Sequence, residues 1–282
     1  MSKIAIITDS TAYIPSDLLR KYNIYVVPQV LCWGNETFDD GVDIKPDEFY
    51  TRLANAKEMP STSQVTPQSF IQIFKQLLEQ DYQIAAILLP PSLSGTVASA
   101  QKACEDFPDS PIAIIESNST SMAMGLQVLA AARLATNGAN LEEVELIVKK
   151  ARQQTGVVFA VNTLEFLHRG GRIGGASRYL GTALNIKPIL EITGGKVQAI
   201  ERVRTRKKSL LRLVELVEER VKDKQPVRLA VLHARAEKDA RELLKTAESR
   251  INIEESIFSE VSPVIGTHAG PGTVGLAYMY GI

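Results

Sequence analysis

The first half of the chain alternates short apolar runs with segments of helical periodicity. The apolar runs predict buried strands at residues 4–7, 25–32, 84–89 and 112–115. Helical patterns lie between them, starting at Pro15 and at residues 46–54, 67–80 and 97–107. Turn residues at 34–35 and 40–41 flank a predicted hairpin. This alternation predicts a largely parallel sheet with helices on both faces.

The pattern changes in the second half of the chain. Two helices are predicted at 126–136 and 141–154, and a strand at 157–161 follows them. Gly194-Gly195 separates two alternating runs, 189–192 and 197–203, which indicates a hairpin. The pattern beyond the hairpin predicts charged helices at 208–222 and 237–251 and strands at 227–232 and 274–280. We therefore expect an α/β protein of two domains, residues 1–157 with a parallel sheet and residues 158–282 with a mixed sheet.

Composition narrows the class of protein. Apolar residues make up 45% of the 282 residues, enough for a buried core. Lys plus Arg and Asp plus Glu number 32 each, so the overall charge predicts neither nucleic acid nor anionic membrane as a partner. Cys32 and Cys104 lack CxxC spacing, which argues against a zinc site and a disulfide framework and fits a reducing cytosol. No apolar stretch approaches the roughly 20 residues that span a bilayer. We expect a soluble cytoplasmic protein without a metal or cofactor.

Three short motifs of small polar residues lie among the apolar segments. They offer hydroxyls, backbone N–H groups and one imidazole, and they occupy residues 61–64, 92–96 and 266–272. Neutral donors of this kind suit holding an anionic head group more than breaking bonds. Ser94 lies near the predicted start of a helix, where unpaired N–H groups and the helix dipole favour an anion, and Gly95 leaves the backbone open to close approach. We therefore interpret the chain first as a binding protein.

Two further polar turns follow predicted strands, at residues 8–10 and 116–119. Ligands of open α/β sheets bind outside the carboxyl ends of the strands, so both turns are candidate site segments. Ser, Thr, Asn and Asp also favour turns for purely local reasons. Both interpretations stay open for these two segments.

Residues 166–175 carry four glycines and two arginines. The segment matches neither the dinucleotide fingerprint nor a P-loop. Its glycines permit either tight packing or a phosphate cradle, and Arg169 and Arg172 are candidate interdomain ion-pair partners.

Of the three histidines, His268 is the candidate ligand-facing residue. It lies in a glycine-rich segment without helical or strand periodicity, where a loop has little structural need for an imidazole. A spatial partner such as Asp9 remains open.

Residues 202–208 form a dense basic run. Alternation along a strand would put Arg202, Arg204 and Arg206 on one side. The run is either a solvated face or a docking patch for an acidic protein or a phosphorylated ligand. Nucleic acid is less favoured, because no aromatic residue interleaves the basic ones.

These motifs, taken together and in order, resemble the DegV family of bacterial fatty-acid-binding proteins over essentially the whole chain. The segments that carry the resemblance are residues 8–10, 40–43, 60–64, 93–96, 166–175 and 204–206, with His268 inside 266–272. The chain has Val65 where this family often has proline, and Glu116 where aspartate is commoner.

The resemblance implies a long-chain fatty acid held between two domains. Thr62, Ser94 and His268 would surround its carboxylate, with Ser63, Gly95 and Thr96 beside them. Some members of this family present the bound acid to a fatty acid kinase that makes an acyl phosphate, and we expect this role in phospholipid synthesis here. The basic run then supplies Arg202, Arg204 and Arg206 as candidate partner-binding residues. We expect the protein itself to be a lipid carrier and not an enzyme. Apolar residues available to line a tunnel are Met122, Met124, Leu126, Ile173, Leu180 and Ile186, although each of them taken singly is expected to be ordinary core.

Two enzyme hypotheses compete with this one. The family is related to the substrate-binding part of dihydroxyacetone kinases, where a histidine binds a ketose. A serine hydrolase would use Ser94 as nucleophile and His268 as base, although a G-x-S-x-G motif is missing.

Overall fold

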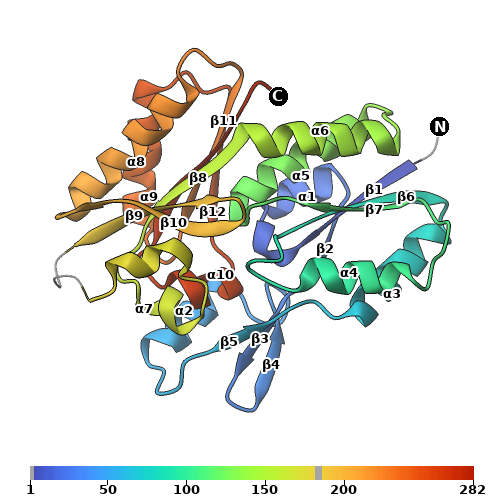
Figure 1. The fold of residues 1–282 in the computed structure, drawn as a ribbon, viewed down its shortest axis with the longest axis horizontal. Helices are drawn as coiled ribbons and strands as arrows, with labels where there is room; N and C mark the ends of the chain where they lie inside the picture. The colour runs from blue at the N-terminus through green and yellow to red at the C-terminus, as the bar shows by residue number, and fades with distance from the viewer. Residues whose placement is uncertain (1–2, 182–185) are drawn as a thin grey trace.

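The computed structural model describes residues 3–181 and 186–282, whose strands form three sheets (Figure 1). A parallel sheet occupies the N-terminal part and a mixed sheet the C-terminal part, which confirms the expected α/β class. Among the described residues, no helix is both long and apolar enough to cross a membrane.

The N-terminal sheet has four parallel strands in the order β2-β1-β6-β7. These strands are β1 (Lys3–Asp9), β2 (Ile24–Val27), β6 (Tyr82–Leu88) and β7 (Ile112–Glu116). One face packs against α3 (Pro67–Leu78) and α4 (Thr96–Cys104), and the other against α5 (Ser121–Thr136) and α6 (Leu141–Gln154). The short helices η1 (Ser10–Ala12) and α1 (Ser16–Lys21) connect β1 to β2.

Helix α3 shows how local sequence produces these elements. Thr66 caps it by accepting a hydrogen bond from the Ser69 N–H at 3.2 Å, and Pro67 occupies the first turn. Phe70, Phe74 and Leu77 recur at helical spacing and are fully buried against the sheet. The helix predicted from this spacing is therefore confirmed.

The predicted strand at 25–32 is wrong, because the structure divides it between two sheets. β2 ends at Val27, and β3 (Val30–Trp33) joins a separate antiparallel sheet in the order β4-β3-β5. Pro28 lies at the break, where its missing N–H would interrupt a central strand. The predicted hairpin joins β3 to β4 (Glu36–Asp39). The short strand β5 (Ser61–Ser63), which follows α2 (Pro46–Ala54), was not predicted from the sequence.

The C-terminal sheet has six strands in the order β10-β9-β8-β13-β11-β12. They are β8 (Thr155–Ala160), β9 (Lys187–Thr193), β10 (Lys196–Val203), β11 (Val227–His233), β12 (Glu255–Glu260) and β13 (Val274–Tyr280). Only the β11–β12 pairing is parallel among the described strands of this sheet. Helices α8 (Arg206–Val221) and α9 (Glu237–Arg250) cover its outer face. Three short helices complete the described part: α7 (Glu165–Arg169), η2 (Gly174–Tyr179) and α10 (Pro263–Ala269).

Helix α5 lies between the two large sheets (Figure 1). It contacts β1 and β6 on one side and β8, β11 and β13 on the other. It begins at Ser121 and not at the predicted Leu126, and it is buried from Ser121 to Ala132. Because α5 packs on both sheets, one core cluster spans both halves of the molecule. α6 ends at Gln154, where β8 of the second sheet follows, and a domain boundary at 157 stays a prediction.

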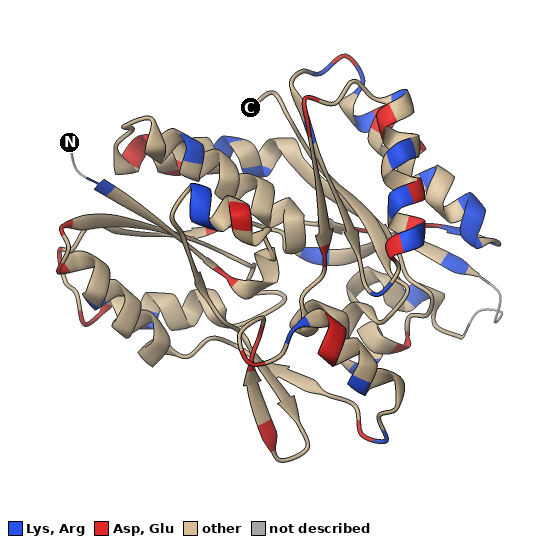
Figure 2. Ribbon diagram, turned by 180° about the vertical axis from the view of Figure 1, so that it is seen from behind, with Lys and Arg blue, Asp and Glu red and all other residues tan. Residues whose placement is uncertain are grey.

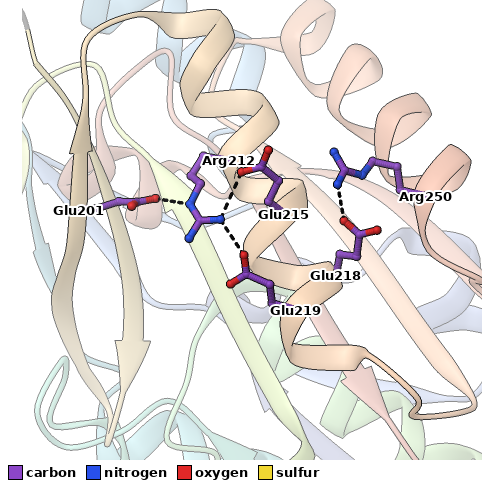
Figure 3. Close-up of polar contacts among 6 residues, drawn as sticks. All are labelled: Glu201, Arg212, Glu215, Glu218, Glu219 and Arg250. Carbon is purple, nitrogen blue, oxygen red and sulfur yellow. Dashed lines mark hydrogen bonds and ion pairs between the residues drawn. The ribbon is translucent and has the colours of Figure 1, made fainter.

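Charged residues gather on α8 and α9 (Figure 2). Arg212 of α8 pairs with Glu201 of β10 at 2.6 Å and with Glu215 and Glu219 of its own helix (Figure 3). The neighbouring pair Arg250–Glu218 joins α9 to α8 at 2.5 Å. Exposed pairs of this kind contribute at most about 1 kcal/mol each. Their main effect is that many charges of this surface neutralise one another.

Candidate functional site

A cavity of about 240 Å³ lies between the two large sheets. Both halves of the chain contribute apolar walls to it, which include Leu89, Val157, Phe159, Ile192, Leu232, Val261 and Val264. Hydroxyl, amide and cationic groups line the rest, and among them are Thr62, Ser63, Gln64, Ser94, Arg172 and His268. The cavity therefore combines an apolar interior with a polar cluster, as an amphipathic ligand requires.

None of the predicted tunnel residues is among the described residues that line this cavity. Met122, Met124 and Leu126 are buried in the core around α5, and Leu180 is 40% exposed. Ile173 packs beside the C-terminal sheet. Met122, Met124 and Leu126 are therefore ordinary core, which was the expectation for each residue taken singly. Hydrophobicity shows that a side chain is buried but not which surface buries it.

His268 lies in the last turn of α10 and not in a loop, which corrects the sequence-based expectation. Ser262 caps this helix by accepting the Ile265 N–H at 3.2 Å, and Pro263 occupies its first turn. The glycines that hid the helical pattern have packing roles. A Cβ on Gly266 would lie 2.5 Å from the Tyr50 hydroxyl oxygen, so only glycine lets α10 approach α2 this closely.

The imidazole of His268 is held from two sides. Its Nε2 atom shares a hydrogen bond with the Thr62 hydroxyl at 2.8 Å. On the opposite side it abuts Gly170, where a Cβ would lie 2.0 Å from Nδ1. Nδ1 is buried and has no partner among the described residues. Strand β5 and helix α10, more than 200 residues apart in sequence, thus meet at one side of the cavity.

Burial lowers the pKa of His268 to about 4, and the nearby charge of Arg172 acts in the same direction. The imidazole is therefore neutral at pH 7. A bound anion beside Nε2 would favour the protonated form and raise this pKa.

Ser94 and Gly95 line the cavity just before α4. The N-cap position belongs to Gly95, and no side chain of the described residues caps the helix, so its first-turn N–H groups have no side-chain acceptor among them. Thr96 is fully buried and is not among the described lining residues. Its hydroxyl shares a hydrogen bond with Ser94 at 2.9 Å and accepts one from Gln29, so it orients Ser94 from behind.

Gln64 connects the first two polar motifs. Its amide donates to Ser99 of α4 at 2.8 Å, and its side chain lies so close to Gly95 that a Cβ there would clash. Ser63 and Ser94 are thereby brought to the same part of the cavity wall.

Arg172 is a site residue that the sequence analysis did not assign to the ligand. It lines the cavity, where its guanidinium donates to the Leu93 carbonyl at 3.1 Å and to the Gly170 carbonyl at 2.7 Å. No acidic partner is found for it among the described residues, whereas Arg169 pairs with Glu165 on its own helix. The presence of two arginines in a glycine-rich segment was the sequence feature that could have indicated an anion-binding residue. Only the fold shows which of the two arginines faces the cavity.

Packing explains most glycines of the 166–175 segment. Gly170 makes room for His268, and Gly174 and Gly175 lie against Val197 and Gln198 of β10. The packing interpretation of this segment is therefore the one that the structure supports.

Asp9 is not a partner of His268. It accepts hydrogen bonds from Thr11 and from the Leu89 N–H at 3.0 Å, and burial raises its pKa. Asp40 connects the N-terminal and C-terminal halves of the chain, accepting from the Ser10 hydroxyl at 2.6 Å and from the Val264 N–H at 3.2 Å. These contacts fix the start of α10, and with it the position of His268.

The expected one-sided row of arginines does not form. β10 ends at Val203, so Arg202 is on the strand, Arg204 follows it, and Arg206 begins α8. Arg206 pairs with Asp239 at 2.7 Å, and the Arg202 guanidinium stacks over Tyr179. Arg204 is exposed.

The atoms that a serine hydrolase would need are not joined. Ser94 bonds to Thr96, and His268 bonds to Thr62. Nδ1 of the imidazole has no acid to orient it among the described residues. The arrangement presents donors and a cation to a ligand instead.

Comparison with known proteins agrees with this geometry. Residues 3–281 match a family model described as "Uncharacterised protein, DegV family". A DegV domain-containing protein of Clostridium perfringens is 35% identical over 98% of each chain. A solved structure described as fatty acid binding of a DegV family protein from Thermus thermophilus superposes with a TM-score of 0.93 at 32% identity, covering 99% of each chain. DegV of Bacillus subtilis, described as a fatty acid binding protein, superposes with a TM-score of 0.89 at 30% identity, covering 99% of this chain and 100% of that one. The chain belongs to the DegV family.

Proposed function

We propose that this protein binds a long-chain fatty acid in the interdomain cavity. Thr62, Ser94 and His268 hold the carboxylate by hydrogen bonds, with the backbone of Gly95 beside them. Arg172 supplies the positive charge. The observation that carries the proposal is the cavity itself, whose apolar walls from both domains adjoin this cluster of donors. The solved relatives described as fatty acid binding support the same ligand class.

The acyl chain supplies most of the affinity. Burying about 15 methylenes at about 0.8 kcal/mol each contributes about 12 kcal/mol before costs. Association and ordering of the chain offset a large part of this. A few donors therefore suffice to orient the carboxylate without dominating affinity.

The carrier acts on the ligand by presenting it and carries out no chemistry itself. A separate kinase phosphorylates the carboxylate to an acyl phosphate in the cytoplasm, and the product feeds phospholipid synthesis. Arg202 and Arg204, exposed beside the end of β10, form the contact for an acidic face of that kinase. Arg206 contributes less, because Asp239 already pairs with it.

Extraction of the purified protein with organic solvent, followed by mass spectrometry, tests the ligand. The expected result is close to one fatty acid per chain. A covalently retained ketose, or esterase turnover by the purified protein, would instead support one of the enzyme hypotheses.

A charge reversal tests the kinase contact. Arg202→Glu with Arg204→Glu is expected to abolish acyl phosphate formation with a cognate kinase and to leave fatty acid binding unchanged. Lys245→Glu, an exposed reversal on α9, is the control and is expected to change neither. Full acyl phosphate formation by the double variant would make the basic run only a solvated face.

A further inference from the structure

A second cleft lies between the two domains, at the carboxyl end of β7. Its volume is about 260 Å³, and Ile192 is the one residue that it shares with the fatty acid cavity among the described lining residues. Since liquid water takes about 30 Å³ per molecule, this is room for a compact organic molecule and too much for a single ion. Its walls include the 117–119 turn, which the fatty acid site does not use.

Gln127 lines this cleft and carries an unpartnered polar atom. It lies on α5 among apolar residues and is 1% exposed. Its Nε2 atom donates to the Ser117 carbonyl at 3.1 Å, which fixes the orientation of the amide. The Oε1 atom is buried and accepts no hydrogen bond from the described residues. An orphaned buried acceptor costs free energy, and a ligand with a donor would remove that cost.

Arg152 provides an uncompensated charge. It lines the cleft, and its guanidinium donates to the Glu116 backbone carbonyl at 3.1 Å. No carboxylate pairs with it among the described residues, whereas the other cleft arginine, Arg220, pairs with Glu191 at 2.6 Å. The lining side chains therefore carry a net positive charge, which suits an anion.

We propose that this cleft binds a compact organic anion that carries at least one hydroxyl group. The anionic group contacts Arg152, and the hydroxyl donates a hydrogen bond to Oε1 of Gln127. The site is separate from the fatty acid cavity, and the proposal stands whether or not the chain binds fatty acid.

Two matched pairs of probes test the proposal by calorimetric titration. The carboxylate pair is malate and succinate, of which malate has one additional hydroxyl. The phosphate pair is glycerol 1-phosphate and propyl phosphate, of which glycerol 1-phosphate has two additional hydroxyls. The hydroxylated member of at least one pair is expected to bind the wild-type protein about threefold or more tightly than its partner, as one hydrogen bond predicts. The pair that binds identifies the anionic group as carboxylate or phosphate.

Variants assign the contacts. Arg152→Gln is expected to weaken binding about tenfold or more, and Gln127→Leu is expected to abolish the preference for the hydroxylated probe. Gln127→Met replaces Gln127→Leu if the latter unfolds, and Lys149→Gln, on the exposed side of α6, is the control. The proposal is overturned if no probe binds below about 10 mM, or if Arg152→Gln binds as tightly as the wild type.

Discussion

Replacing Gly170 by alanine tests the position of His268 without touching the imidazole itself. Gly170 has a φ of −74°, which alanine adopts freely, so the substitution introduces no backbone strain. The new Cβ would lie 2.0 Å from Nδ1 of His268, whereas real Cβ contacts stay above 3.0 Å. The ring or the 170 backbone must therefore move by about 1 Å. A ring displaced this far loses its 2.8 Å hydrogen bond to Thr62 and its place beside the carboxylate.

The expected cost is that of the hydrogen bond which the displaced imidazole no longer makes to the carboxylate. A hydrogen bond to a charged group contributes about 1.5–3 kcal/mol. Removing it corresponds to about a 10- to 100-fold increase in the dissociation constant. The apolar wall is unchanged, so the acyl chain keeps its share of the affinity.

A double-mutant cycle isolates this effect from general damage. Fluorescent fatty acid titrations would compare the wild type, Gly170→Ala, His268→Ala and the double variant, each with a thermal melt. In the His268→Ala background the three atoms nearest to the added methyl are gone, so Gly170→Ala is expected to be nearly neutral. Equal losses in both backgrounds, or wild-type affinity for Gly170→Ala, would refute the reasoning.

Three further predictions concern the same cluster. Ser94→Ala is expected to lower fatty acid affinity by about 1–2 kcal/mol with the fold intact; unchanged affinity in titration would remove Ser94 from the head-group site. His268→Gln is expected to bind fatty acid better than His268→Asn, because the longer amide reaches the Nε2 position that contacts Thr62, and titration showing the reverse order would contradict this. His268 has a pKa of about 4 in the folded protein against an ordinary 6.5, so the folded state favours the neutral imidazole. This preference contributes up to about 3 kcal/mol of stability above pH 6.5, and the contribution is lost as the pH falls from 6.5 to 4. Denaturant unfolding of the wild type and of His268→Gln between pH 4 and pH 7 checks this pH dependence. Asp40 has a pKa raised by burial to about 6, which changes stability in the opposite direction, but both proteins carry it and its effect cancels in the comparison. A difference in unfolding free energy between the two proteins that does not change with pH would count against the lowered pKa of His268.

Local sequence patterns predicted the helices and strands whose caps, turns and apolar residues all lie within the element itself. Helix α3 carries its cap, its proline and its apolar stripe within a short segment, so the sequence alone located it. Short elements were missed, because β5 has three residues and α10 contains a glycine that only its packing against α2 explains.

The candidate site likewise contains residues that the sequence identified and residues that only the structure identified. Thr62, Ser94 and His268 were selected by residue type and motif order, and the structure places all three in the cavity wall. Arg172 was not assigned to the ligand, and none of the apolar residues considered for a tunnel is among the described residues that line the cavity. Which residues line a cavity depends on which surfaces do not pack against each other. That property comes from the packing of the two large sheets around α5, and no periodicity in the sequence reports it.

The sequence by itself determined the α/β class, the order of most strands and helices, and the polar groups available to a ligand. These follow from hydrophobic periodicity and capping, which act over one or two helical turns. The tertiary structure alone decided that β5 and α10 meet, that Asp40 anchors α10, and that Arg172 faces the cavity while Arg206 pairs with Asp239. Such contacts join residues far apart in the chain, and they depend on the packing of both sheets against α5.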